Sequence, residues 1–182
     1  MTKHSSQENL STGSHPMNTP CIEKITVNIG VGEAGERLQK AQTVLESITH
    51  QRPVQTLSTK VNKDFGTRKR MPIGCKVTLR GQRAGTFLKQ ALDTRENKLA
   101  DYSIDDQGNF SFGIPDHTLF KDQKYNPDIG IFGMDVCVTM GKPGYRVKHR
   151  RIQRRKIRSV VQVDRDETRQ FITQQFGVEV IE

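Results

Sequence analysis

Two segments of this chain alternate between apolar and polar residues along nearly their whole length. In residues 22–29 (IEKITVNI) three aliphatic residues share one parity, although Ile22 falls out of phase, and residues 73–80 (IGCKVTLR) alternate in the same way. Because successive side chains of a strand point to opposite faces, each segment is predicted to be a strand with one polar face. Strands of this kind favour an antiparallel sheet with one covered face and one open face.

Further patterns complete the prediction of the fold. Apolar residues at helical spacing predict one amphipathic helix over residues 33–49 and a second whose stripe ends at Leu99. Asp164 and Glu167 form a capping box that begins a third helix, and Gly177 ends it. Because strands and helices do not alternate regularly, we predict an α+β fold in which helices pack on one face of an antiparallel β-sheet. Further strands are predicted at residues 54–61, 110–114 and 131–140.

The open face of this sheet has a distinctive predicted composition. The polar positions of the two alternating segments carry cations and hydrogen-bonding groups and no acid; they are Lys24, Thr26, Asn28, Lys76, Thr78 and Arg80. Groups of these types contact the sugars, phosphates and base edges of nucleic acids. The face left open by the helices is therefore predicted to bind RNA.

The positive charge of the chain is concentrated in one stretch. Residues 142–158 hold nine Lys/Arg and no acid, which equals the net charge of +9 of the whole chain. Residues 60–83 add eight bases against the single acid Asp64. A nucleic-acid backbone is the commonest partner for such a density of charge. In the arm we expect the backbone to be bound by Arg146, Lys148, Arg150, Arg151, Arg154 and Arg155.

The length of 182 residues suits one domain with arms. We predict a disordered, polar N-terminal tail at residues 1–16 and a single domain at residues 17–182, with a basic loop at residues 60–72 and a basic arm at residues 142–163. No apolar run is long enough to span a bilayer, and the N-terminus has no hydrophobic block of the secretory type. No membrane partner is expected.

A glycine-rich turn offers an alternative function. The sequence from Gly30 to Gly35 reads G-x-G-x-x-G between a predicted strand and a predicted helix, as in an NAD(P)-binding oxidoreductase. The acid expected about 20 residues further on is missing, because the only charged residues among 54–63 are bases. A tight strand-to-helix turn is the preferred interpretation. A general DNA- or chromatin-binding protein acting through the arm is another alternative.

No constellation of residues indicates catalysis or metal binding. The histidines are scattered, and the three cysteines form no C-x-x-C pair, so neither an enzyme nor a cofactor is predicted. Cys75 and Cys137 are interpreted as small apolar fillers of strands. Phe110 and Phe112 share one face of a short strand, and core packing is favoured over base stacking.

Four long segments resemble the ribosomal protein L-five family of the large subunit, in its archaeal and eukaryotic branch. They read IEKITVNIGVGEAGERLQKA, MPIGCKVTLRG, GNFSFGI and YNPDIGIFGMDVCVT, and the resemblance runs from about Met17 to Glu182. It implies a cytoplasmic, ribosomal protein that binds 5S rRNA in the central protuberance. The positions that the resemblance assigns to rRNA binding are Lys24, Asn28, Gln51, Thr56, Thr78 and Arg80. The family often has Gly before Gln51, where this chain has His50, so a different turn is expected there.

The resemblance also implies further partners. The loop 62–72 matches the tRNA-facing loop of the family, with Lys63, Arg68, Lys69 and Arg70 as the residues expected to face P-site tRNA. The other partners implied are 23S rRNA, a small-subunit head protein across an inter-subunit bridge, and neighbouring large-subunit proteins. The function predicted from both lines of reasoning is that of a structural, rRNA-binding constituent of the large ribosomal subunit.

Overall fold

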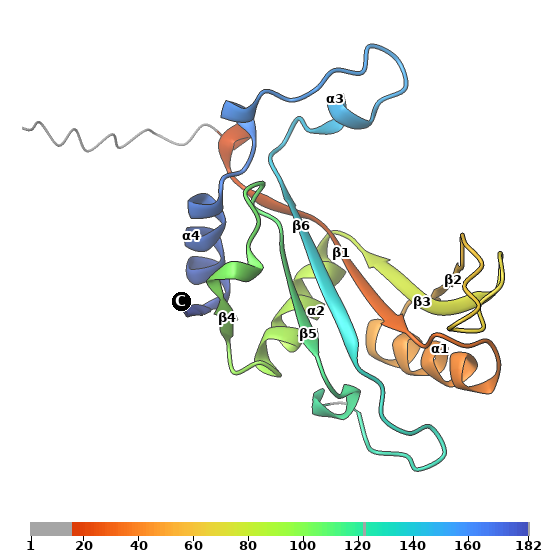
Figure 1. Ribbon diagram of the computed structural model, residues 1–182. Coiled ribbons are helices and arrows are strands. Elements are labelled where there is room, and N and C mark those ends of the chain that lie inside the picture. The colour runs from red at the N-terminus through yellow and green to blue at the C-terminus, as the bar shows by residue number, and fades with distance from the viewer. Residues whose placement is uncertain (1–15, 122, 182) are drawn as a thin grey trace, which may run out of the picture.

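The computed structural model describes residues 16–121 and 123–181, so almost all of the predicted tail at residues 1–16 lies outside the described residues. Its centre is a five-stranded sheet in the order β2-β3-β1-β6-β5, in which every pairing is antiparallel (Figure 1). The predicted fold class is therefore confirmed. The strands are β1 (Cys21–Gly30), β2 (Val54–Leu57), β3 (Pro72–Leu79), β5 (Phe110–Ile114) and β6 (Met134–Gly141).

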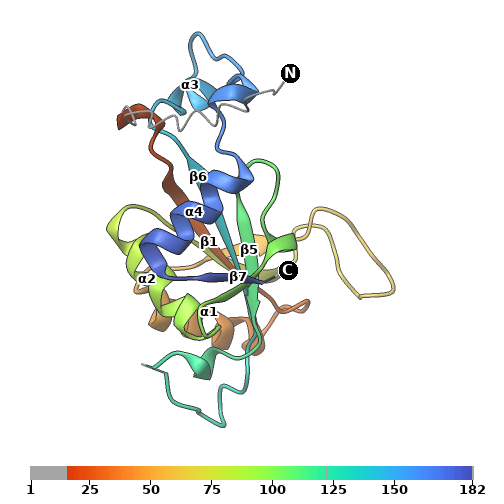
Figure 2. The same ribbon diagram turned by 90° about the vertical axis from the view of Figure 1, so that its left-hand side faces the viewer.

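Two helices cover only one face of this sheet. Viewed along the sheet edge, α1 (Glu36–Thr49) and α2 (Gln82–Asp93) lie on the same side (Figure 2). The helices pack their apolar stripes on the inward residues of the central strand β1, of which Ile25, Val27 and Ile29 are fully buried. Burial of this apolar surface is the main force that holds the layers together. The polar residues that alternate with these buried residues consequently face solvent.

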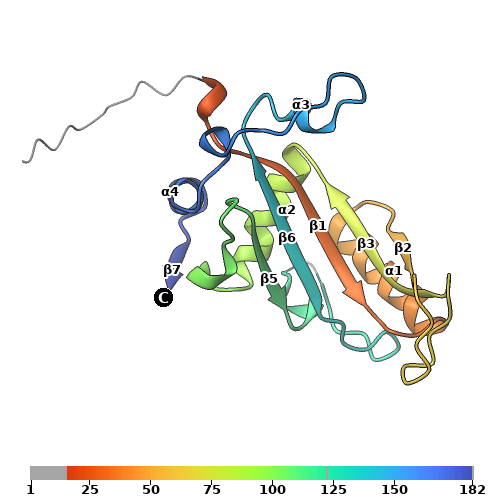
Figure 3. The same ribbon diagram turned by 45° about the horizontal axis from the view of Figure 1, so that its top comes forward.

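The C-terminal part of the chain forms a second, smaller unit beside β5. Helix α4 (Arg165–Phe176) leads into β7 (Glu179–Ile181), which pairs in parallel with β4 (Lys98–Ala100). The predicted capping box of Asp164 and Glu167 is present, and Gly177 ends α4 in the left-handed conformation with φ of 65°. Figure 3 shows α4 and β7 at the β5 side of the sheet. No helix among residues 16–121 and 123–181 is long and apolar enough to cross a membrane.

Several predicted boundaries of helices and strands are wrong. Helix α1 begins at Glu36 because Gly35, with φ of 135°, occupies the N-cap position. Strand β2 ends at Leu57, four residues before the predicted end, and β6 begins three residues late. Leu99 is buried as expected, but it belongs to β4, because the left-handed residues Glu96 and Asn97 separate it from α2.

The glycine-rich turn does not belong to a dinucleotide-binding fold. Such a fold requires parallel strands around the turn, whereas β1 pairs antiparallel with both of its neighbours. The turn is instead fixed to the sheet by the backbone N–H groups of Val31 and Gly32, which both donate to the carbonyl of Ile73. The NAD(P)-dependent alternative is therefore wrong, and the interpretation as a tight turn holds.

A glycine of β3 permits the close approach of its neighbouring strands. A Cβ atom at Gly74 would lie 2.8 Å from the backbone oxygen of Ile29 and 2.8 Å from Oγ1 of Thr56. Since the first of these atoms belongs to the backbone of β1, the sheet would have to open to admit it. We therefore expect Gly74→Ala to lower the free energy of unfolding by about 1–3 kcal/mol, as overpacking does.

A second glycine provides the matched control for this prediction, measured by urea denaturation. Gly85 lies within α2, and a Cβ atom there would meet nothing within 4 Å. Gly85→Ala should raise the free energy of unfolding by about 0.5–1 kcal/mol, since alanine has the higher helix propensity. Equal effects of the two substitutions would contradict the assigned packing of β1, β2 and β3.

Candidate nucleic-acid interface

The polar residues predicted for the open face lie on one side of the sheet. Thr26 pairs with Thr78 and Asn28 pairs with Lys76, so their side chains share the face that the helices leave uncovered. All are exposed or half-buried, whereas the alternate residues of both strands are buried. Arg80 follows directly at the end of β3 and is exposed. The same-face arrangement of Lys24, Asn28, Thr78 and Arg80 agrees with the alternation in the sequence.

A β-bulge at Glu23 explains why Ile22 falls out of phase. The pairing of β1 with β6 shifts between Ile22 and Lys24, so that Glu23 is an extra residue in β1. The bulge lets Ile22, opposite the buried Met140, pack against the core although its sequence parity differs from that of the later isoleucines. Bulges of this kind re-aim side chains near functional surfaces.

The bulge also brings an acid to this end of the face. The Arg80 guanidinium donates from Nη1 to the backbone oxygen of Glu23 at 3.3 Å and lies 3.9 Å from its carboxylate. The His149 imidazole of the arm lies 3.7 Å from the same carboxylate. A second acid, the exposed Asp135, stands opposite Asn28 on β6. The polar positions predicted from alternation included no acid, but the bulge residue Glu23 of β1 and Asp135 of β6 place two acids beside them.

Gln51 and Thr56 lie at the β2 edge of the sheet. Gln51 donates from Nε2 to the backbone oxygen of Thr78 at 3.3 Å, beyond the point where β2 stops pairing with β3. Thr56 lies opposite Gly74, and its side chain is half-buried. His50, which was expected to change the turn, adopts the left-handed conformation with φ of 50° that glycine favours. The turn therefore keeps a glycine-like conformation.

A tyrosine clasp joins the two ends of the basic arm. Its short helix α3 (Arg146–His149) follows Tyr145, whose hydroxyl donates to the Val161 carbonyl at 3.1 Å and accepts from the Val163 N–H at 2.9 Å. Burial, reinforced by the charges of Glu167 and Glu23, raises the pKa of the Tyr145 phenol, so the hydroxyl keeps its proton at neutral pH. Both ends of the arm are thereby joined.

One cation of the arm is used inside the protein. The Lys142 side chain is 5% exposed, and its ammonium group lies 2.7 Å from the Glu167 carboxylate. It is therefore unavailable to an external anion. The six arm residues predicted to contact RNA are all exposed, except that Arg150 is half-buried and donates from Nε to the Gln153 carbonyl at 2.8 Å.

The basic loop projects from the sheet on the open side. Residues 58–71 join β2 to β3, and a β-bridge between Asn62 and Thr67 closes the loop into a narrow hairpin. Figure 2 shows this loop extending away from the side that α1 and α2 cover. All four cations expected to face tRNA are exposed; they are Lys63, Arg68, Lys69 and Arg70.

The arm and the loop lie at opposite ends of the face. The arm starts after Gly141, which pairs with the first residue of β1, whereas the loop leads into β3, where Gly74 pairs with the last residue of β1. Since β1 has 10 residues, the two basic zones are separated by roughly 30 Å at the rise of an extended strand. The candidate interface is therefore a polar platform with cations at both ends. The platform consists of Lys24, Thr26, Asn28, Lys76, Thr78 and Arg80.

The remaining candidate groups show no sign of chemistry. Among residues 16–121 and 123–181, no group of three His, Cys, Asp or Glu side chains could hold a metal ion. Cys75 is buried, and burial raises the pKa of its thiol to about 11, as for an inert core thiol. Cys137 is exposed on the open face, so its interpretation as a filler is wrong. Phe110 and Phe112 are buried, which confirms core packing.

Comparison with known proteins shows the family of the chain. A family model for the C-terminal part of the ribosomal protein L5 family matches residues 72–178, and a second model, described as "Ribosomal protein L5", matches residues 15–68. Similar relatives are named "Large ribosomal subunit protein uL5". The protein of Methanococcus aeolicus is 49% identical over 168 residues, which are 91% of this chain and 93% of the relative. The protein of Methanobrevibacter smithii is 47% identical over 167 residues, 92% and 98% of the two chains.

These matches define the class of the protein as a structural constituent of the large ribosomal subunit, and not an enzyme. A further relative, from Methanococcus maripaludis strain C5, is 50% identical over 169 residues that cover 91% of this chain and 93% of its own. The chain belongs to the ribosomal protein L5 family.

The Tyr145 clasp yields a test of how the arm is held. Tyr145→Phe removes the acceptor of the Val163 N–H and should lower the free energy of unfolding by about 1–2 kcal/mol, as expected for an unpaired, partly buried donor. Because the arm is rich in Lys and Arg, limited trypsin digestion should cleave residues 146–158 faster in this variant. Tyr125→Phe, in an exposed loop, is the control. An unchanged cleavage pattern would show that the clasp does not hold the arm.

Proposed function

We propose that this protein binds 5S rRNA through the open face of its sheet and helps to attach it in the central protuberance of the large ribosomal subunit. The observation that carries the proposal is the uncovered polar platform itself. Lys24, Asn28 and Thr78 stand on one face of adjacent strands, and Arg80 ends the same row. The family membership supports this choice of partner, since the resemblance noted in the sequence assigns these positions to rRNA.

The side chains of the platform suit distinct parts of an RNA. Lys24 and Arg80 are cations that neutralise phosphates, whereas Asn28 and Thr78 donate and accept hydrogen bonds at sugar hydroxyls or base edges. Gln51 and Thr56 extend these contacts along the β2 edge. The platform is broad and has few aromatic groups, so the shape of the folded RNA contributes more than base stacking at these six positions.

The two basic zones extend the contact beyond the platform. The arm contributes its exposed cations, Arg146, Lys148, Arg151, Arg154 and Arg155 together with the half-buried Arg150, to the backbone of 5S or 23S rRNA. The loop at the opposite end carries Lys63 and Arg68–Arg70 towards P-site tRNA and the small-subunit head, where a head protein and neighbouring large-subunit proteins complete the surroundings. The site of action is the cytoplasmic ribosome.

A pair of lysines on opposite sides of the sheet tests the platform. Lys24→Ala should weaken 5S rRNA binding and lower the slope of log K against log salt by roughly 0.7–0.9, the contribution of one phosphate contact. Lys89 is exposed on α2, on the helix-covered side, so Lys89→Ala should change neither quantity. Filter binding at several salt concentrations measures both. If the two variants lost affinity equally, the platform would not be the binding surface.

Competition binding separates the proposed function from general binding of polyanions. At moderate salt, labelled 5S rRNA should resist displacement by random duplex DNA, because duplex DNA matches the cations of the arm but not the shape of the platform. Equal displacement by unlabelled 5S rRNA, tRNA and duplex DNA would instead support a protein that binds through charge alone.

A further inference from the structure

A hollow opens beside the platform, at the β5 edge of the sheet. It has a volume of about 410 Å³ and lies where the edge strand β5 meets β4 and the turn Asp101–Ser103. In Figure 2 this turn lies beside β5, on the side away from α1 and α2. Its wall combines the apolar Leu99, Ala100 and Phe112 with polar and small residues, which are Arg95, Tyr102, Ser103, Ser111, Gly113, Asp135 and Cys137.

The hollow exists because the outward positions of β5 carry small residues. Gly113 pairs with Asp135, and a Cβ atom built on Gly113 would approach no atom closer than Oδ1 of Asp135, at 3.9 Å. Neither a positive φ nor a close contact therefore requires glycine at this position. What the missing side chain provides is open space in front of the exposed Asp135 carboxylate, which accepts hydrogen bonds.

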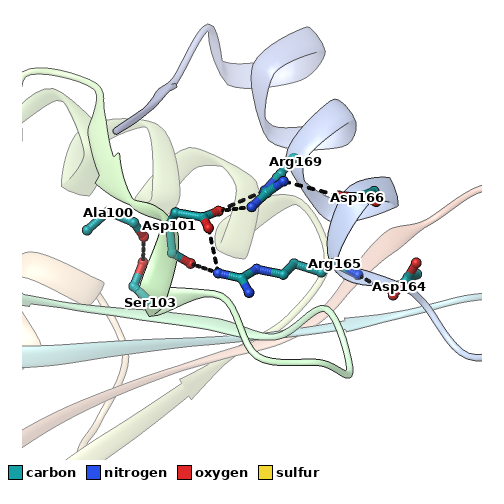
Figure 4. Close-up of polar contacts among 7 residues, drawn as sticks. All are labelled: Ala100, Asp101, Ser103, Asp164, Arg165, Asp166 and Arg169. Carbon is teal, nitrogen blue, oxygen red and sulfur yellow. Dashed lines mark hydrogen bonds and ion pairs between the residues drawn. The ribbon is translucent and has the colours of Figure 1, made fainter. Parts of the chain in front are cut away.

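Tyr102 stands at the rim of the hollow and is 88% exposed. The residue before it is held firmly, because Arg165 donates from Nη2 to the backbone oxygen and to Oδ2 of Asp101, at 2.7 and 2.6 Å (Figure 4). Arg169 donates from Nε to the other carboxylate oxygen at 2.8 Å. Two residues further on, Ile104 is buried and forms a β-bridge with Phe110. The exposed ring is thus presented from a turn that is fixed on both sides.

The composition of the wall indicates what this ring contacts. Asp and Ser are depleted in protein–protein interfaces, whereas Asp135, Ser103 and Ser111 line this hollow beside Tyr102. An exposed aromatic ring among hydrogen-bonding groups is an arrangement that can hold an unstacked RNA base. Because the turn that carries the ring is already fixed, its backbone loses little conformational freedom on binding.

We propose that the hollow binds one unpaired base of the RNA, stacked on Tyr102 with its hydrogen-bond donors facing Asp135. Guanine fits best, because its adjacent ring N–H and amino group match the two oxygens of a carboxylate. This inference rests on the proposed function, since the base belongs to the same RNA that the platform holds.

Fluorescence tests the stacking directly. The chain has no tryptophan, so Tyr102→Trp introduces a single reporter at the rim, and its emission should be quenched when 5S rRNA is added. Tyr125→Trp places the same reporter at another exposed tyrosine, in the loop before β6, where emission should not change. Quenching of both reporters, or of neither, would overturn the inference.

Affinity measurements test the hollow without relying on the reporter. Gly113→Val fills the space with a residue that strands favour, and Tyr102→Ala removes the ring; both should weaken 5S rRNA binding on the order of 5- to 150-fold, the effect of losing one stacked base. The salt slope should stay at the wild-type value, because no phosphate contact is lost. Tyr102→Phe should bind almost as tightly as the wild type. Thermal unfolding of each variant checks that the fold is intact.

The outcomes distinguish this inference from the proposed function. If the wild-type protein does not prefer 5S rRNA over duplex DNA, the proposed function fails and the hollow with it. If the wild type binds 5S rRNA and the Tyr102→Ala and Gly113→Val variants bind it equally well, only the hollow proposal is wrong. Loss of affinity with a lowered salt slope would also contradict it, because it would identify a phosphate contact.

Discussion

The antiparallel register of β1 between β3 and β6 is the constraint on which both the core and the polar platform depend. Because side chains alternate with a period of two, the register that buries Ile25, Val27 and Ile29 also directs Lys24 and Asn28 outward. A slip of one residue would exchange the two sets completely. The apolar core therefore fixes the position of every polar group on the platform, although the two share no side chain.

Period-two alternation is also why part of the interface was predictable from the sequence. Alternation predicts the orientation of four side chains, because only the register of two strands decides which way they point. These side chains are Lys24, Asn28, Thr78 and Arg80. Gln51 lies outside any strand, and its contact with the Thr78 carbonyl depends on how α1 ends. Only the family resemblance could select it.

The predictions that failed depended on contacts between distant parts of the chain. Leu99 satisfied a helical stripe, yet pairing with Val180, which no local pattern encodes, makes it part of a strand. Lys142 belongs to the basic stretch of the sequence, but Glu167, 25 residues further along the chain, pairs with it inside the protein. The out-of-phase Ile22 did indicate the β-bulge. The bulge could be recognised only once the pairing of Ile22 with Met140 of β6 was known.

The acids beside the platform bear on specificity. A uniformly cationic surface attracts every polyanion, whereas an acid at a fixed position repels a phosphate placed there and thereby disfavours wrong orientations of the RNA. Glu23 does this at the arm end while it orients Arg80 and lies near His149, and Asp135 does so near Asn28. The RNA proposed as partner is therefore expected to place its phosphates at Lys24, the arm and the loop, and not beside Asp135 in the hollow. A neutral base with hydrogen-bond donors is the part of an RNA that such an excluded position admits. The position of the acids on this face therefore explains both where phosphates are favoured and why a neutral base is proposed at Tyr102.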